Sequence, residues 1–172
     1  SESIFDKYEK CNLNINIPDD IINYDYILLL DVIEHIYNPE EFIENLTKKI
    51  SSKQKIIVST GNVSFFIIRL MLLFGYFNYG KRGILDKTHT RLFTRSTFKK
   101  IFTNYNFKIL KIIGIPAPYP LAFGKNMFSN ILLIINNLLI KILPHLFSYQ
   151  TLIVLKPPET LEQMLSETIK GK

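Results

Sequence analysis

Hydrophobic residues along the chain fall into short unbroken runs and longer helical patterns. Residues 26–30 and 56–58 are continuously apolar, and polar residues follow each run at once. Between them, Phe42, Leu46 and Ile50 recur at steps of four, the spacing of an amphipathic helix. Strand, helix and strand in this order predict a βαβ unit whose two strands are parallel and buried on both faces.

The remaining elements are predicted from the same patterns. Alternating polarity favours a short strand at 11–16, and further apolar segments predict a helix at 96–104 and strands at 107–113 and 149–155. Two long segments, 63–79 and 127–143, are mostly apolar; the first is apolar nearly all round, and charged or amide side chains interrupt both. Neither is expected to span a bilayer. Residues 63–79, if helical, must be buried in protein, in a partner or in a membrane interface.

Length and composition predict one globular domain. The chain has 172 residues, of which 47% are hydrophobic, and this content excludes a disordered protein. We divide it into a polar N-terminal remnant or linker at 1–10, a domain at 11–156 and a polar tail at 157–172. The single cysteine, Cys11, permits no internal disulfide, and the N-terminal residues lack the pattern of a signal peptide. We therefore expect a cytoplasmic protein.

Charge is distributed unevenly along the chain. Residues 51–156 hold 15 Lys and Arg against one acidic residue, Asp86. Such a segment favours an anionic partner, which can be a membrane surface, an acidic substrate or a nucleic acid. Biased composition remains an alternative, because Ile, Asn and Lys are frequent throughout. Nucleic-acid binding is the weakest alternative and is not predicted, because the cations are not interleaved with aromatic residues in a known module.

Three polar residues follow the first buried strand: Asp31, Glu34 and His35. In parallel sheets, ligands bind at the carboxyl ends of the strands, so these side chains are expected at a ligand edge. Asn38 and Pro39 then suit the N-cap and first residue of the next helix. Glu34 and His35 are also residue types that bind divalent ions, but two adjacent residues are weak evidence and no metal site is predicted.

Three motifs resemble those of one enzyme family. Residues 31–35, followed by Asn-Pro, are similar to the segment after strand 4 in class I S-adenosylmethionine (SAM)-dependent methyltransferases, in particular the ubiquinone-biosynthesis O-methyltransferases. Residues 59–63, Ser-Thr-Gly-Asn-Val, resemble the end of strand 5 in that group. Residues 88–94, Thr-His-Thr-Arg-Leu-Phe-Thr, resemble its His-x-Arg-x-Phe-Thr segment. The resemblance covers residues 11–156.

This resemblance implies a fold and a cofactor. The fold is an α/β Rossmann-like methyltransferase sandwich, here incomplete because the first two strands are absent. The Gly-rich turn after strand 1 and the acidic residue ending strand 2, which hold the cofactor in the family, are absent as well. We therefore expect an exposed sheet edge, covered by a second copy or another chain.

The resemblance also implies roles for individual residues. His89 is the expected general base or substrate orienter, His35 is the second catalytic candidate, and an anionic acceptor group would pair with Arg91. Structural roles for His89 and Arg91 are the alternative. The residues expected to contact SAM are Asn12, Leu13, Leu30, Asp31, Val32 and Glu34. Those expected to contact the acceptor are Asn62, Tyr79 and Arg91.

Two functions follow as hypotheses. The first is the C-terminal portion of a SAM-dependent methyltransferase that methylates a hydroxyl of a small-molecule, lipid-linked, quinone or glycan acceptor. The second is a non-catalytic domain, derived from such an enzyme, that binds a membrane or a partner. Lipid association of the related enzymes at the equivalent of residues 63–83 implies a peripheral contact with the inner face of the membrane.

Overall fold

The computed structural model describes residues 8–159 and has a mixed α/β architecture. Its strands are β1 (Tyr26–Leu30), β2 (Lys55–Gly61), β3 (Lys108–Ile115) and β4 (Gln150–Lys156). Its α-helices are α1 (Pro39–Lys49), α2 (Phe66–Leu73), α3 (Arg95–Thr103), α4 (Tyr119–Phe123), α5 (Met127–Ile142) and α6 (Pro144–Phe147). Two short 3₁₀ helices are η1 (Asp19–Asn23) and η2 (Ile33–His35).

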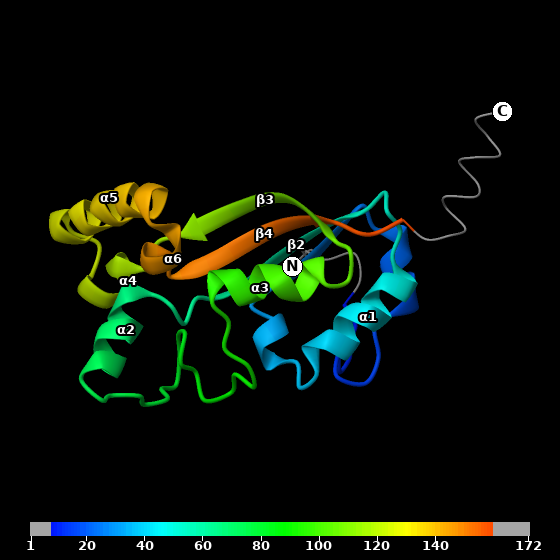
Figure 1. Ribbon diagram of the computed structural model, residues 1–172, viewed down its shortest axis with the longest axis horizontal. Coiled ribbons are helices and arrows are strands. Elements are labelled where there is room, and N and C mark those ends of the chain that lie inside the picture. Colours follow the sequence, from blue (N-terminus) through cyan, green and yellow to red (C-terminus); the bar gives the residue numbers. More distant parts are fainter. Residues whose placement is uncertain (1–7, 160–172) are drawn as a thin grey trace, which may run out of the picture.

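The four strands form one sheet in the order β1-β2-β4-β3 (Figure 1). β1 and β2 are parallel, which confirms the predicted βαβ unit, whereas β4 runs antiparallel to both β2 and β3. The last strand is therefore inserted between β2 and β3. Its N-terminal end meets the C-terminal end of β2, because Gln150 pairs with Gly61.

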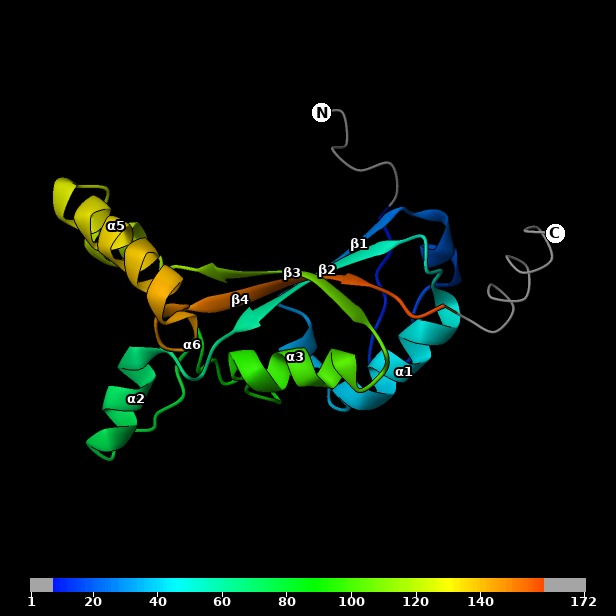
Figure 2. The same ribbon diagram turned by 45° about the horizontal axis from the view of Figure 1, so that its top comes forward.

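Helices α1 and α3 pack on one face of this sheet (Figure 2). The main core lies between them and the strands, and its largest fully buried side chains include Phe98, Phe102 and Leu46. Both helices begin at a side-chain cap. The amide of Glu41 donates to Oδ1 of Asn38 at 3.3 Å, which confirms the cap predicted there, and Thr94 caps α3.

β1 differs from its prediction. The run was expected to be covered on both faces, but only Ile27 and Leu29 are buried, whereas Tyr26, Leu28 and Leu30 are exposed. The reason is that α1 and α3 cover only one face of the sheet, and no described helix packs on the other face of β1. The predicted exposed edge is present among residues 8–159.

The strand predicted at 11–16 is not formed. The segment is a turn, in which the carbonyl of Asn12 accepts hydrogen bonds from the amides of Ile15 and Asn16. The side chain of Asn12 also accepts from the amide of Asn14 at 3.1 Å. Such local bonds compete with strand pairing, and a pattern of alternating polarity does not report them.

The two long apolar segments form helices of different length. α2 occupies eight residues of the first and ends before Gly75, whose φ is +77°, whereas α5 occupies nearly the whole of the second. Among residues 8–159, none of the helices combines the length and the apolar character that crossing a membrane requires. The predicted tail beyond residue 159 lies outside the described residues.

Candidate active site

A hollow of about 220 Å³ lies where the C-terminal ends of β1 and β2 meet the N-terminal end of β4. Four of the predicted site residues line it, and six further residues complete it. The lining residues are Asp31, Glu34, His35, Gly61, Gly83, Ile84, Asp86, His89, Tyr149 and Gln150. The parallel pair of strands thus brings the predicted loops to one edge of the sheet.

Asp31 is held rigidly at the end of β1. Its φ of +52° lies in the left-handed region, which few residues other than glycine, asparagine and aspartate adopt. The hydroxyl of Ser59 donates to Oδ1 at 3.0 Å, and Nε2 of Gln150 donates to Oδ1 and Oδ2 at 2.9 and 2.8 Å. These bonds fix the carboxylate and link β1 to β4 across β2.

Glu34 is a buried carboxylate in η2, with 2% of its surface exposed. Its backbone carbonyl accepts from the amides of Thr90 and Arg91, and so ties η2 to the loop before α3. Burial raises the pKa of the carboxyl group, and the nearby charge of Asp31 adds to the effect. Because Oε2 is buried with no hydrogen-bond partner in the structure, one acceptor oxygen is available to a donor.

His35 and His89 come together at the rim of the hollow. Their rings meet edge to face with centroids 4.8 Å apart. Nδ1 of His35 lies 3.2 Å from the carbonyl of Thr88, and Nδ1 of His89 lies 3.0 Å from the carbonyl of Ile84. A carbonyl only accepts, so each Nδ1 must carry the proton in these bonds, and each neutral ring keeps Nε2 as its basic nitrogen.

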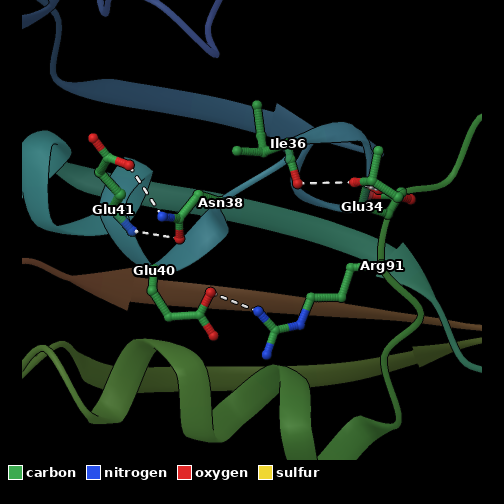
Figure 3. Close-up of polar contacts among 7 residues, drawn as sticks. Glu34, Ile36, Asn38, Glu40, Glu41 and Arg91 are labelled. Carbon is green, nitrogen blue, oxygen red and sulfur yellow. Dashed lines mark hydrogen bonds and ion pairs between the residues drawn. The ribbon is translucent and has the colours of Figure 1, made fainter.

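Arg91 does not line the hollow. Its guanidinium forms an ion pair with the carboxylate of Glu40 on α1, with Nη1 and Oε2 2.5 Å apart (Figure 3). It also lies over the ring of Phe93, 5.6 Å from the centroid. The predicted contact of Arg91 with an anionic acceptor stays a prediction, and an acceptor would compete with Glu40 for this side chain.

Asn62 and Tyr79 also lie apart from the hollow. Asn62 is 1% exposed, and its Nδ2 donates to the carbonyls of His145 and Ser148 at 3.0 and 2.8 Å. Its amide therefore holds the α6 turn against the end of β2. Tyr79 is half-exposed after α2 and packs on Phe77. Their predicted roles in acceptor binding stay predictions.

The residues predicted to contact SAM are divided between two places. Asp31 and Glu34 line the hollow described above. Leu13 lines a second hollow of about 350 Å³ beside α1, and Asn12 lies in the turn next to it. Leu30 is exposed at the end of β1, and Val32 packs against the main core.

Two residues that the sequence reasoning missed belong to this site. Tyr149 and Gln150 line the hollow from β4. The sequence predicted the strand at 149–155 but not its direction. Its antiparallel pairing with β2, which brings Gln150 to Asp31, is a tertiary feature. Gly83 is required here as well. Its φ is +90°, and a Cβ would lie 2.9 Å from the hydroxyl of Tyr149.

The part of the site that the structure describes contains no cluster of metal-binding side chains. Among residues 8–159, no three His, Cys, Asp or Glu residues are grouped so that they would hold a metal ion. Asp86 lies near the two histidines, but the amide and hydroxyl of Thr88 donate to its Oδ1 at 2.8 and 2.7 Å. These hydrogen bonds hold the pKa of Asp86 below its usual value.

Comparison with known proteins gives a match to one family model. A model for a methyltransferase domain matches residues 4–112, more than half of the chain. No curated protein matches the sequence.

Three solved structures resemble the fold. One is the small RNA methyltransferase HEN1, with a TM-score of 0.48, 17% identity and coverage of 83% of this chain and 15% of that one. A SAM-dependent methyltransferase from Archaeoglobus fulgidus has a TM-score of 0.44 and 21% identity over 77% of this chain and 58% of that one. A protein from Listeria monocytogenes, classed as an S-adenosylmethionine-dependent methyltransferase, has a TM-score of 0.51 and 14% identity. The match covers 89% of this chain and 69% of that one. This chain therefore spans less than two thirds of the first two, and the likeness is one of fold.

Proposed function

Because the chain belongs to the methyltransferase-domain family, we propose that it takes part in methyl transfer to a hydroxyl group of a small acceptor. SAM is the cofactor of this family and supplies the methyl group as a sulfonium. The acceptor classes that we propose are a quinone, a lipid-linked molecule or a glycan, on the basis of the resemblance to the ubiquinone O-methyltransferases. Residues 88–94, which carry that resemblance, include His89 of the hollow.

The hollow that holds the two histidines does not by itself fit the whole of SAM. The hollow of about 220 Å³ is smaller than the roughly 300–1,000 Å³ of typical small-molecule sites. The carboxylate of Asp31 is already engaged by Ser59 and Gln150. Among the described residues that line the hollow, Oε2 of Glu34 is then the buried acceptor without a partner. These residues supply one wall of a cofactor site, and β1, with its unpaired edge, borders that wall.

Within this proposal, His89 removes the proton of the acceptor hydroxyl. A hydroxyl is a weak nucleophile, and a positioned base raises the rate of its reaction by about 10²–10⁴-fold. Hydrogen bonding of Nδ1 to the carbonyl of Ile84 leaves Nε2 basic and fixes the plane of the ring. His35, in edge-to-face contact, limits the rotation of that ring and lines the same hollow.

The observation that carries the proposal is the convergence of both histidines with Asp31 and Glu34 at one hollow. The test is transfer of radiolabelled methyl from SAM to phenolic, quinol and glycan acceptors by the full gene product. We expect His89→Ala to lower turnover by about 10²-fold or more. His145→Ala is the matched control, because His145 lies in α6, away from the hollow. Turnover of His89→Ala near that of the unaltered protein would refute the assignment.

A second function is favoured by the exposed outer face of β1. Leu28, at 58% exposure, and the unpaired edge of the same strand offer a surface that a second copy or another chain can cover. In that case the domain binds a partner without catalysing transfer. Equilibrium dialysis of the full gene product against radiolabelled SAM distinguishes the two functions, since a domain that has lost the cofactor site would not retain SAM.

A further inference from the structure

Helix α5 carries an apolar stripe on its outward face. The exposed apolar residues recur at helical spacing and occupy one side along the full 16 residues of the helix, about 24 Å at 1.5 Å per residue. We call this set the α5 stripe: Met127, Phe128, Ile131, Ile134, Ile135, Leu138 and Ile142. The stripe faces away from the fold, whereas the other apolar residues of the helix, Leu132, Leu133, Leu139 and Ile140, are half-buried.

Polar bonds hold the opposite side of α5 against the fold. Ser129 and Asn136 are the buried residues of the helix. Asn136 accepts from the amide of Ala117 at 3.0 Å and donates to the carbonyl of Phe147 at 2.9 Å. Turning the stripe inward would break both bonds and leave buried polar groups unpaired, at a cost of about 1–3 kcal/mol for each group. The hydrogen bonds of Asn136 therefore fix the outward orientation of the stripe.

The surroundings of the stripe are apolar and cationic. Leu121 and Phe123 of α4 are exposed beside α5, and Phe123 packs edge to face on Phe128. α2, with its own exposed apolar residues, lies at the same end of the molecule (Figures 1 and 2). Lys125 precedes the helix and Lys141 lies in its last turn, and both are exposed.

The charge of residues 87–158 favours an anionic membrane over a second copy of the chain as the partner of the α5 stripe. From Lys87 to Pro158 the sequence holds ten Lys and Arg residues and no acidic residue. A second copy placed on the stripe would bring like charges together, whereas an anionic bilayer neutralises them. An apolar face with lysines at its border is the pattern of helices that lie in a membrane interface.

We propose that α5 lies in the plane of an anionic membrane, with the α5 stripe inserted among the lipid chains and Lys125 and Lys141 at the headgroups. The proposal goes beyond methyl transfer and holds whether or not the site is catalytic. It differs from the contact expected at residues 63–83, because it rests on another helix and on its outward orientation.

A single tryptophan tests the position of the helix, because the chain contains none. Leu138→Trp should shift its emission to shorter wavelength when phosphatidylglycerol vesicles are added, and lipids brominated on their chains should quench it. Ile15→Trp is the control. It replaces a residue that is 83% exposed in a segment next to α1, at the opposite end of the molecule from α5 (Figure 1), and should not respond.

Paired charge variants test the affinity. Ile134→Glu/Leu138→Glu should lower the partition coefficient onto phosphatidylglycerol vesicles by about tenfold or more, because two apolar side chains no longer insert. Ile15→Glu/Ile22→Glu adds the same charge away from α5 and should lower the partition coefficient much less. Lys125→Gln/Lys141→Gln should weaken binding to these vesicles, and the remaining affinity should depend less on salt.

Two results would overturn the proposal. One is the absence of a vesicle-dependent shift in Leu138→Trp while its circular dichroism matches that of the unaltered protein. The other is emission that is already shifted without lipid, together with a dimer in light scattering that Ile134→Glu/Leu138→Glu dissociates. That second result would assign the stripe to a second copy of the chain.

Discussion

The rings of His35 and His89 meet edge to face, with centroids 4.8 Å apart, although one follows β1 and the other lies in the loop before α3. Each ring is held by a backbone carbonyl at Nδ1. The contact joins the two loops that carry the family resemblance, so its energy bears on both the stability and the geometry of the site.

The first prediction concerns this pair. His35→Ala, His89→Ala and the double variant should show a coupling free energy of about 0.5–1.5 kcal/mol in chemical unfolding, the range of aromatic pairs in contact. Additive effects would mean that the ring contact contributes nothing to stability. His145→Ala combined with His89→Ala provides the additive control.

The second prediction concerns Glu34. Burial places its folded-state pKa above the ordinary value of 4.5, so the folded protein holds this proton more tightly than the unfolded chain does. The corresponding stability is fully present below about pH 4.5 and is lost as the pH rises through the folded-state pKa.

Glu34→Gln should therefore melt at a higher temperature than the unaltered protein at neutral pH, and the difference should shrink as the pH falls. Calorimetric scans between pH 4 and 8 measure this, with Glu44→Gln on the exposed side of α1 as control. A difference that is constant over the whole range would show that titration of Glu34 is not its cause.

The third prediction concerns Gln150. Gln150→Glu places a second carboxylate where Nε2 now lies 2.8 Å from Oδ2 of Asp31, so like charges face each other. The variant should melt below Gln150→Met at neutral pH and should recover as the pH falls and one carboxyl group takes up a proton. If the two variants melt alike at every pH, the contact with Asp31 is not maintained in solution.

The fourth prediction concerns Asn62. Asn62→Ala leaves the buried carbonyl of Ser148 without its donor and should lower the free energy of unfolding by about 1–3 kcal/mol. Asn137→Ala, at an exposed position of α5, should have little effect. Lost turnover with unchanged stability in Asn62→Ala would instead support the predicted contact with the acceptor.

The fifth prediction concerns Gly114, where β3 meets α5 and α6. An added Cβ would lie 2.2 Å from Oγ of Ser148 and 2.8 Å from Cγ2 of Ile140, so Gly114→Ala should destabilise the fold by about 1–3 kcal/mol. Gly80→Ala is the control, because the nearest atom to its added Cβ lies at 3.6 Å. Equal stability of the two variants in urea unfolding would contradict the close packing of α5 on β3.

The sequence alone determined the features that depend on neighbouring residues. Apolar runs and helical spacing located β1, α1 and β2, and the cap signal at Asn38 located the start of α1. Parallel pairing followed from the order of elements, and so did the expectation that Asp31, Glu34 and His35 lie at one edge. These features are local, because helix and strand periods and caps involve residues close in sequence.

Only the tertiary structure decided which surfaces are covered and which distant groups meet. The run at β1 reads as a strand buried on both faces, yet the helices cover only one face of the sheet and leave Leu28 exposed on the other. The direction of β4 brings Gln150 to Asp31, and the polar anchor at Asn136 turns the α5 stripe outward. A hydrophobic pattern predicts which side chains are favoured to be buried. It does not predict which segment packs against such a side chain, because burial depends on contacts between segments far apart in the chain.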